Sequence, residues 1–375
     1  MDVTAIICEY NPFHNGHKIQ IEYIRKNYPD TVIVAIMSGN TTQRGEFAVL
    51  EKYDRAEIAL KGGVDVVLEL PYPWCCASAG YFALGGVSTA KKIGADRICF
   101  GSECGDIALL KNAAKRLSCR EFEEKLKLEL GLNPGCAYMS VRSELYKKLY
   151  GEQIPEGANN LLGIEYISKA EETGYKGGFI TCKREARFSA TECRNAIKNG
   201  DRESLYEMLP CDFECNFSEQ KNADSLFLWN IGNAEATELE GYCDIDGTLA
   251  SSMKANAEKA TTLSEYLSLC TNKKYPRARI ARATMNAILK TTEKHLKSEP
   301  LFTVLLGCNG NGRRFLSHNR GNGDIALITK NADYKNYSPK IREQFEFSLK
   351  SDKLYSVLHN LEREYVMKKS PVITK

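Results

Sequence analysis

The chain has 375 residues and a mass of 42.0 kDa, and 43% of its residues are hydrophobic and 26% charged. These values are ordinary for a soluble globular protein and exclude collagen-like, disordered and small disulfide-stapled chains, and the length predicts two or three domains. Taken as a total, the net charge of +3 argues against a nucleic-acid partner, because such partners favour strongly basic domains.

The first hundred residues alternate between strand-like and helix-like segments. Strands are predicted at 3–8, 31–37, 64–70 and 97–100, and helices at 17–27, 51–62 and 77–93. Strands separated by helices of this length favour a parallel sheet that is covered on both faces. Ligands bind such sheets at the carboxyl ends of the strands, so we expect the loops after these four strands to share one edge.

The alternation continues only to about residue 200. Residues 105–150 read as helical, 177–182 as a further strand and 189–198 as a helix. Beyond them, helices are predicted over 218–270 and 276–298, short strands at 301–306 and 325–329, and a last helix before the C-terminal tail. We therefore expect an α/β domain over residues 1–200 and a mainly α-helical domain over residues 201–375.

Fourteen cysteines are present, but none forms a C-x-x-C pair, and only five histidines accompany them. We therefore predict no metal site. The N-terminus lacks the basic segment of a signal peptide, and no stretch of 18 apolar residues could span a membrane. The sequence thus predicts a cytoplasmic protein with free thiols and no membrane contact, a redox or metal role being the alternative.

The segment Glu9–His17 carries the clearest chemical signal, because it follows the first predicted strand and opens a helix. Free backbone N–H groups and the helix dipole favour an anion there, and Gly16 lets the backbone approach a phosphate. His14 and His17 can donate hydrogen bonds to phosphate oxygens as charge develops at phosphorus. The alternative is that both histidines are structural or bind a metal. Neither a P-loop nor a G-x-G-x-x-G helix start is present to support another nucleotide-binding class.

Further polar segments follow the other strands and a later helix start. Gly101 after the fourth strand could let a nucleoside pack against the backbone. The Asn159–Asn160 pair could contact a ligand or simply cap a helix, and Arg184 could contact phosphates or be solvated. Ser189 and Thr191 open a helix as part of an S-x-x-E capping box, which is a second possible anion site.

Together these segments resemble one family, the bacterial tRNA(Met) cytidine acetate ligases, which are nucleotidylyltransferases of the H-x-G-H type. The resemblance is carried by E-Y-N-P-F-H-N-G-H at 9–17, M-S-G-N with Q-R-G-E at 37–46, G-V-D-V-V-L-E-L-P at 63–71, F-G-S-E-C-G-D at 100–106, N-N-L-L-G at 159–163 and S-A-T-E-C-R at 189–194. Two departures stand out: Gly80 replaces a glutamate usual in the family, and the loop at 185–188 is shorter.

The resemblance implies a Rossmann-like nucleotidylyltransferase domain and a two-step reaction. ATP and acetate would form acetyl-adenylate, and the acetyl group would pass to N4 of the wobble cytidine of elongator tRNA(Met). Mg²⁺ would accompany ATP, and His14 and His17 would be catalytic. The implied ATP-binding residues are Ile7, Cys8, Glu9, Tyr10, Asn11, Pro12, Phe13, His14, Asn15, Gly16, His17, Lys18, Ile19, Gln20, Gly101, Asn159, Asn160 and Arg184.

Two other functions remain open at this stage. The chain could adenylylate a small phosphorylated or carboxylated metabolite without RNA, or it could be a nucleotide-binding regulator that has lost turnover. The intact His14–His17 pair weighs against the regulator. A basic surface beside the active site would favour the tRNA enzyme over the metabolite enzyme, because only the former must bind RNA.

The charge is in fact divided very unevenly along the chain. Residues 1–270 hold 30 Lys and Arg against 39 Asp and Glu, whereas residues 271–375 hold 21 against 9. A solvated helix face is one interpretation of the basic part. We favour a polyanion-binding region, because dense like charge repels itself unless a partner relieves it. The residues predicted to bind tRNA are Lys273, Lys274, Arg277, Arg279 and Arg282.

Overall fold

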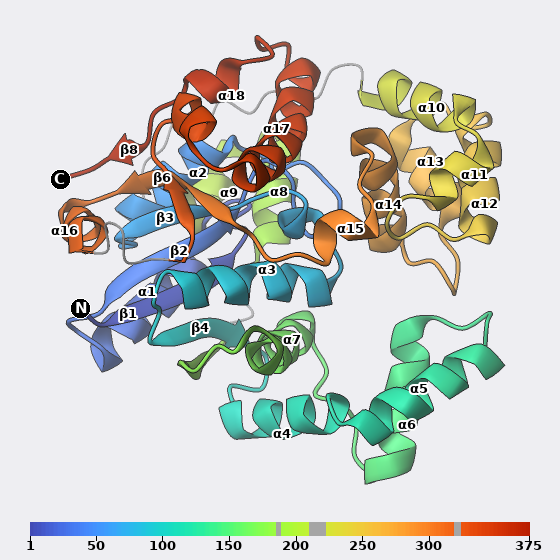
Figure 1. The fold of residues 1–375 in the computed structure, drawn as a ribbon, viewed down its shortest axis with the longest axis horizontal. Coiled ribbons are helices and arrows are strands. Elements are labelled where there is room, and N and C mark those ends of the chain that lie inside the picture. The colour runs from blue at the N-terminus through green and yellow to red at the C-terminus, as the bar shows by residue number, and fades with distance from the viewer. Residues whose placement is uncertain (185–188, 210–222, 319–323) are drawn as a thin grey trace.

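The structure, a computed structural model, describes residues 1–184, 189–209, 223–318 and 324–375. Its centre is one mixed β-sheet with the strand order β5-β4-β1-β2-β3-β6-β7, and β8 pairs with β6 (Figure 1). The five strands β1 to β5 are parallel, as predicted. The strands are β1 (Val3–Cys8), β2 (Val32–Ser38), β3 (Val66–Leu70), β4 (Arg97–Ser102), β5 (Gly178–Lys183), β6 (Phe302–Cys308), β7 (Ala326–Ile328) and β8 (Val372–Ile373).

Helices cover both faces of the sheet because successive side chains of each buried strand point to opposite sides. On one face Ile7, Val34 and Leu68 belong to a core that includes residues of α3 and α7. On the other face Ile6 and Met37 pack with residues of α1, α2 and α17. Figure 1 shows α2 and α17 on one side of the sheet and α3 and α7 on the other. These helices are α1 (Asn15–Asn27), α2 (Lys52–Lys61), α3 (Ala79–Lys92), α7 (Ala158–Thr173) and α17 (Pro339–Leu358).

Two helical groups project from this α/β body (Figure 1). The first lies between β4 and α7 and contains α4 (Ile107–Leu117), α5 (Arg120–Leu132) and α6 (Tyr138–Tyr150). The second has an apolar core of its own around Tyr266 and Ile280. It contains α10 (Ala223–Asn233), α11 (Ala236–Glu240), α12 (Gly247–Ala257), α13 (Leu263–Cys270) and α14 (Arg277–Leu289).

The remaining elements are short helices elsewhere along the chain. They are η1 (Trp74–Cys76), α8 (Ala190–Asn199), α9 (Arg202–Met208), α15 (Glu293–Leu296), α16 (Gly310–His318), η2 (Asn331–Asn336) and α18 (Tyr365–Lys368). The short 185–188 loop noted in the sequence lies outside the described residues, as do residues 218–222 of the predicted helical segment.

The C-terminal third differs from the prediction in two respects. Instead of one helix over 276–298 there are two, because Lys290 takes a left-handed conformation with φ of 59° and ends α14. The strand predicted at 301–306 is β6, which pairs antiparallel with β3. Residues on both sides of position 200, the predicted domain boundary, therefore share one sheet, although the C-terminal half is mainly helical.

The parallel order places the carboxyl ends of β1, β2, β3, β4 and β5 along a single edge. The loops that follow these strands are the segments that the sequence analysis selected, so the fold confirms that they face the same edge. Within the described residues no helix has the length and apolar character needed to cross a membrane.

Candidate active site at the carboxyl ends of the strands

The loop after β1 leads directly into α1, and His14 caps this helix. Nδ1 of His14 accepts a hydrogen bond from the backbone N–H of Gly16 at 3.0 Å. Nδ1 of His17 accepts one from the backbone N–H of His14 at 3.2 Å. The two imidazole rings stack with their centroids 3.8 Å apart. Each histidine therefore has its Nδ1 fixed as an acceptor, and both rings are held in one orientation.

This arrangement determines what the other ring nitrogens can do. A neutral imidazole that accepts at Nδ1 carries its proton on Nε2, which is then a donor. Nε2 of His14 is buried and has no hydrogen-bond partner in the described part of the chain. A buried donor without a partner is costly, so it marks a place where a ligand acceptor is expected. The site thus holds an unpartnered donor at the N-terminus of a helix, where an anion is favoured.

Both histidines are held in the neutral form. Burial lowers the pKa of His14 to about 4, and the charges of Arg184 and Arg194 add to this effect. Burial also lowers the pKa of His17 well below its ordinary value, with further contributions from His14 and Arg184. At neutral pH the pair therefore acts through N–H donors, and the positive charge of the site comes from the arginines.

Two arginines come from different elements to lie near the histidines. Arg194 of α8 donates to the carbonyl of Asn11 at 3.0 Å and to Oγ1 of Thr191 at 3.0 Å. Arg184 follows β5, and its stem covers Gly101 at the end of β4: a Cβ added to Gly101 would lie 3.0 Å from Cγ of Arg184. The predicted residues Gly101 and Arg184 are thus in contact, and both border the same edge.

Arg55 of α2 is a residue that the sequence analysis missed. Its side chain is fully buried and donates to backbone carbonyls at the ends of two strands: Glu9 at 2.5 Å, Ser38 at 3.1 Å and also Gly39. Carbonyls at strand ends lack ladder partners, and one guanidinium satisfies several of them. Arg55 therefore fixes the loop before His14. A single arginine in an amphipathic helix gives no sequence signal for this role.

Several residues of the predicted 7–20 segment support the site rather than face its open edge. Ile7 packs against Gly86 of α3, and Phe13 packs against Gly62. The amide of Gln20 donates to the carbonyl of Cys99 at 3.2 Å beneath the helix. Asn15 donates to the carbonyl of Glu207 at 2.9 Å. Within this segment His14 is buried, His17 is partly buried and Lys18 is exposed.

The Asn159–Asn160 pair at the start of α7 is already engaged with Glu103. Oε1 of Glu103 accepts from the Asn159 amide at 2.6 Å, and Oε2 accepts from the Asn160 backbone N–H at 2.8 Å. Oδ1 of Asn160 in turn accepts from the backbone N–H of Glu103 at 3.0 Å. Burial favours a higher pKa for Glu103, but these donors lower it overall. The carboxylate thus occupies the N-terminus of α7, and the pair holds the loop that follows Gly101.

The predicted phosphate-binding residues Ser189 and Thr191 also have partners within the chain. Oγ of Ser189 accepts from the backbone N–H of Glu192 at 3.2 Å and lies 3.0 Å from the Glu192 carboxylate. Thr191 accepts from Arg194. The helix cap predicted from S-x-x-E is therefore present, and Arg194 is the cation that this helix contributes to the site.

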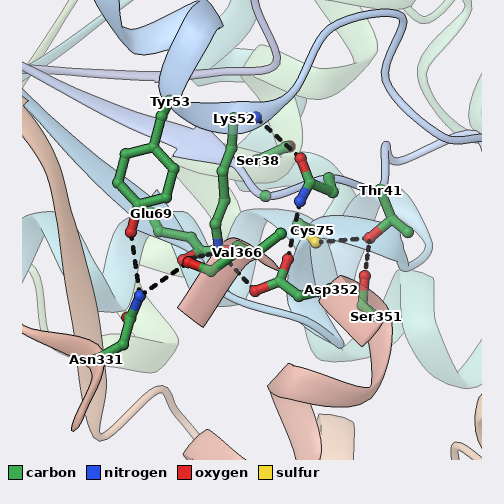
Figure 2. Close-up of polar contacts among 12 residues, drawn as sticks. Ser38, Thr41, Lys52, Tyr53, Glu69, Cys75, Asn331, Ser351, Asp352 and Val366 are labelled. Atoms are coloured by element: carbon green, nitrogen blue, oxygen red, sulfur yellow. Dashed lines mark hydrogen bonds and ion pairs between the residues drawn. The ribbon is translucent and has the colours of Figure 1, made fainter. Parts of the chain in front are cut away.

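A second polar cluster lies along the same edge of the sheet, and Figure 2 shows its parts. Lys52 of α2 is buried, and its Nζ lies 2.9 Å from Glu69 of β3 and 2.7 Å from Asp352 of α17. Asn40 donates to Asp352 at 3.0 Å. Burial raises the pKa of Glu69 to about 7, against the opposing charge of Lys52. A glutamate in the otherwise apolar strand V-V-L-E-L was the available sequence signal, because a buried charge needs a partner.

Four of the five residues predicted to bind tRNA make contacts that the sequence did not reveal, whereas Lys273 is exposed. Arg282 pairs with Asp244 at 2.9 Å, and Arg279 pairs with Asp246 at 3.3 Å. Lys274 also pairs with Asp246, at 3.6 Å. Arg277 is exposed and donates to Ser268 at 3.1 Å. The local density of positive charge is therefore lower than the sequence suggests, since acidic residues before α12 neutralise much of it.

The comparisons with known proteins identify the family of the chain. A family model described as HIGH Nucleotidyl Transferase matches residues 1–370. The tRNA(Met) cytidine acetate ligases of Caldicellulosiruptor bescii and Caldicellulosiruptor saccharolyticus are 32% and 31% identical to the chain, over 99% and 98% of its length and 98% and 96% of their own. The chain therefore belongs to the HIGH nucleotidyl transferases, in the family of the tRNA(Met) cytidine acetate ligases.

A solved structure supports the same family assignment. The crystal structure of Thermotoga maritima TmcAL bound with alpha-thio ATP matches with a TM-score of 0.91 and 26% identity, covering 100% of this chain and 99% of that one. As a HIGH nucleotidyl transferase, the chain has its H-x-G-H segment at the N-terminus of α1, where the unpartnered His14 donor lies. The family resemblance noted from the sequence and the predicted α/β architecture are both confirmed.

Proposed function

We propose that this protein is an ATP-dependent ligase that activates acetate as acetyl-adenylate and transfers the acetyl group to N4 of the wobble cytidine of elongator tRNA(Met). One structural observation supports the proposal most strongly: the unpartnered Nε2 donor of His14 at the N-terminus of α1. The near full-length similarity to tRNA(Met) cytidine acetate ligases supports the choice of reaction within the family.

In the first step an oxygen of acetate attacks the α-phosphorus of ATP. The bond from the α-phosphorus to the bridging oxygen breaks, and pyrophosphate leaves. Negative charge spreads over the phosphate oxygens in the transition state, so fixed donors and cations lower the barrier. We assign this role to the Nε2 donors of His14 and His17 and to Arg184 and Arg194, whose charges lie close enough to affect the pKa of His14.

The proposed nucleotide site runs along the edge from residues 7–20 to Gly101, the Asn159–Asn160 pair and Arg184. Arg55 and the Asn160–Glu103 contacts keep the two loops in place. Mg²⁺ is proposed to accompany ATP, bound by phosphate oxygens and water. The described residues include no group of three or more His, Cys, Asp or Glu side chains that could hold a metal ion.

In the second step the exocyclic amine of the cytidine attacks the acetyl carbonyl, and AMP leaves. The test is reconstitution: purified protein, ATP, Mg²⁺, radiolabelled acetate and a transcript of elongator tRNA(Met), followed by nucleoside mass spectrometry. We expect one N4-acetylcytidine per tRNA and none in a transcript with uridine at the wobble position. ATP hydrolysis or adenylylation of a small molecule without RNA acetylation would favour the metabolite enzyme instead.

A further inference from the structure

A large groove lies between η1, α15 and the first half of α17, at the side of the sheet opposite β5. Its volume is about 1160 Å³, and its lining includes Trp74, Lys294, Lys297, Lys340, Arg342 and Lys350. The usual small-molecule site measures roughly 300–1,000 Å³. The groove therefore has room for a larger ligand than a metabolite, and none of the residues assigned to the nucleotide site above belongs to its lining.

The charge of this groove is strongly positive and largely unpaired. Five cationic side chains line it against two carboxylates, Glu343 and Glu346. Lys297 pairs with Glu293 at 2.7 Å, but the other four make no ion pair with any residue that the structure describes. The region around α14 differs, because Arg282 pairs with Asp244, and Arg279 and Lys274 both pair with Asp246. Among the described residues, the groove therefore holds more unpaired cations than the region of α14, where Lys273 and Arg277 alone lack an ion pair.

One wall of the groove also carries aromatic rings. His295 and Phe347 stack with centroids 3.9 Å apart and an interplanar angle of 9°. Nδ1 of His295 accepts from the backbone N–H of Thr292 at 3.0 Å, which holds its ring in place. Nζ of Lys350 lies 4.5 Å from the centre of the Phe347 ring. Rings next to cations are the features that unpaired RNA bases and their phosphates bind.

One lining residue of the groove comes shortly after a strand that ends at the same edge of the sheet as the proposed active site. Trp74, in its floor, follows the carboxyl end of β3 by four residues and donates to the carbonyl of Ser298 at 3.0 Å. The histidines follow β1, and only β2 lies between β1 and β3, so the backbones of these two strands run about 10 Å apart. Figure 1 shows α15 beside the end of α3 that lies toward the second helical group.

We infer that this groove, rather than the region of α14, binds the phosphodiester backbone of the RNA substrate beside the cytidine that is acetylated. The inference rests on the proposed function for the identity of the RNA. Lys294, Lys340, Arg342 and Lys350 contact phosphates, and the His295–Phe347 layer receives an unpaired base. The concave shape favours a nucleic-acid strand over a flat anionic membrane, and the lysines suit phosphates.

The test compares two double variants of the full-length protein that remove the same charge. Lys294→Gln with Lys350→Gln acts in the groove, and Lys335→Gln with Lys353→Gln removes two exposed lysines outside it, one of them on the same helix α17. Binding of the elongator tRNA(Met) transcript is measured by fluorescence anisotropy at several salt concentrations. We expect the groove variant to bind at least about tenfold more weakly and to lower the salt slope by about 1.5, as two lost phosphate contacts require.

The control variant should bind within about twofold of the unmodified protein. Acetate-dependent ATP–pyrophosphate exchange, which needs no RNA, should be the same in all three proteins. Equal loss of binding in both variants, or loss only in a Lys273→Gln, Arg277→Gln variant at α14, would overturn the assignment. So would a groove variant that still binds tRNA but no longer binds phosphatidylserine vesicles. Absence of exchange in the unmodified protein, with groove-dependent tRNA binding intact, would contradict only the proposed function.

Discussion

Two buried polar clusters lie along the same edge of the sheet, and they differ in whether their groups are satisfied. In the cluster around Lys52, the ammonium group meets Glu69 and Asp352, so the charges are paired within the chain. At the start of α1, His14 keeps a buried Nε2 donor that no described residue accepts. We infer that the paired cluster of Lys52, Glu69 and Asp352 joins α17 to the sheet. We call it the closed cluster, and we call the His14–His17 pair, whose free donor can bind a ligand, the open cluster.

The largest loss of stability is expected when the cation of the closed cluster is removed. Lys52→Met leaves Glu69 and Asp352 buried without their cation, which should lower the unfolding free energy by about 3–5 kcal/mol. Urea unfolding measures this change. Lys61→Met on the same helix is the control, because Lys61 pairs with Glu57 at the surface and such pairs are worth at most about 1 kcal/mol. Equal losses in the two variants would remove the distinction between the buried cluster and an ordinary surface pair.

A substitution in the open cluster should change the activity of the protein rather than its stability. His17→Ala removes a donor to the reacting phosphate, and we expect acetate-dependent ATP–pyrophosphate exchange to fall by about 10²–10³-fold. His318→Ala is the matched control, since His318 is exposed at the end of α16 and should leave the exchange rate unchanged. Exchange at the normal rate in the His17 variant would refute its assigned role.

A smaller loss of stability is expected from a substitution at the start of α7, where the polar side chains also have partners within the chain. Asn160→Ala leaves the backbone N–H groups of Glu103 and Cys104 without their acceptor. These N–H groups are only partly buried, so each lost hydrogen bond should cost about 0.5–1.5 kcal/mol, and thermal or urea unfolding should show a loss of this size. A variant as stable as the unmodified protein would mean that the Asn160 contacts do not hold the loop.

The smallest effect concerns pH. The pKa of His14 is about 4 in the folded chain and near 6.5 when unfolded. Between these values the unfolded chain binds a proton that the folded chain does not. The contribution of His14 is therefore complete above pH 6.5 and is lost as the pH falls toward 4. Unfolding free energies measured from pH 7 to pH 4.5 should decline more steeply in the unmodified protein than in His14→Asn; parallel curves would place His14 in a solvated environment.

The sequence predicted what depends on local pattern and missed what depends on distant pairing. The parallel strands and the helix that follows β1 were predicted from β-branched runs and from a helix start, both visible within a few residues. The entry of β6 into the sheet could not be foreseen, because it pairs with β3 across more than two hundred residues. The contact of Lys52 with Asp352 is equally remote. The pairing of Arg282 with Asp244 likewise reversed the impression of an unneutralised basic helix.

The central claim is that the open donor of His14 serves the adenylation step, and His14→Asn tests it most directly. Asparagine is a favourable helix cap, so the variant keeps an acceptor for the Gly16 N–H but has no donor at the position of Nε2. We predict that its unfolding free energy stays within about 1 kcal/mol of the unmodified protein, while acetate-dependent ATP–pyrophosphate exchange falls at least about a hundredfold. A stable variant that exchanges pyrophosphate at the normal rate would contradict the claim.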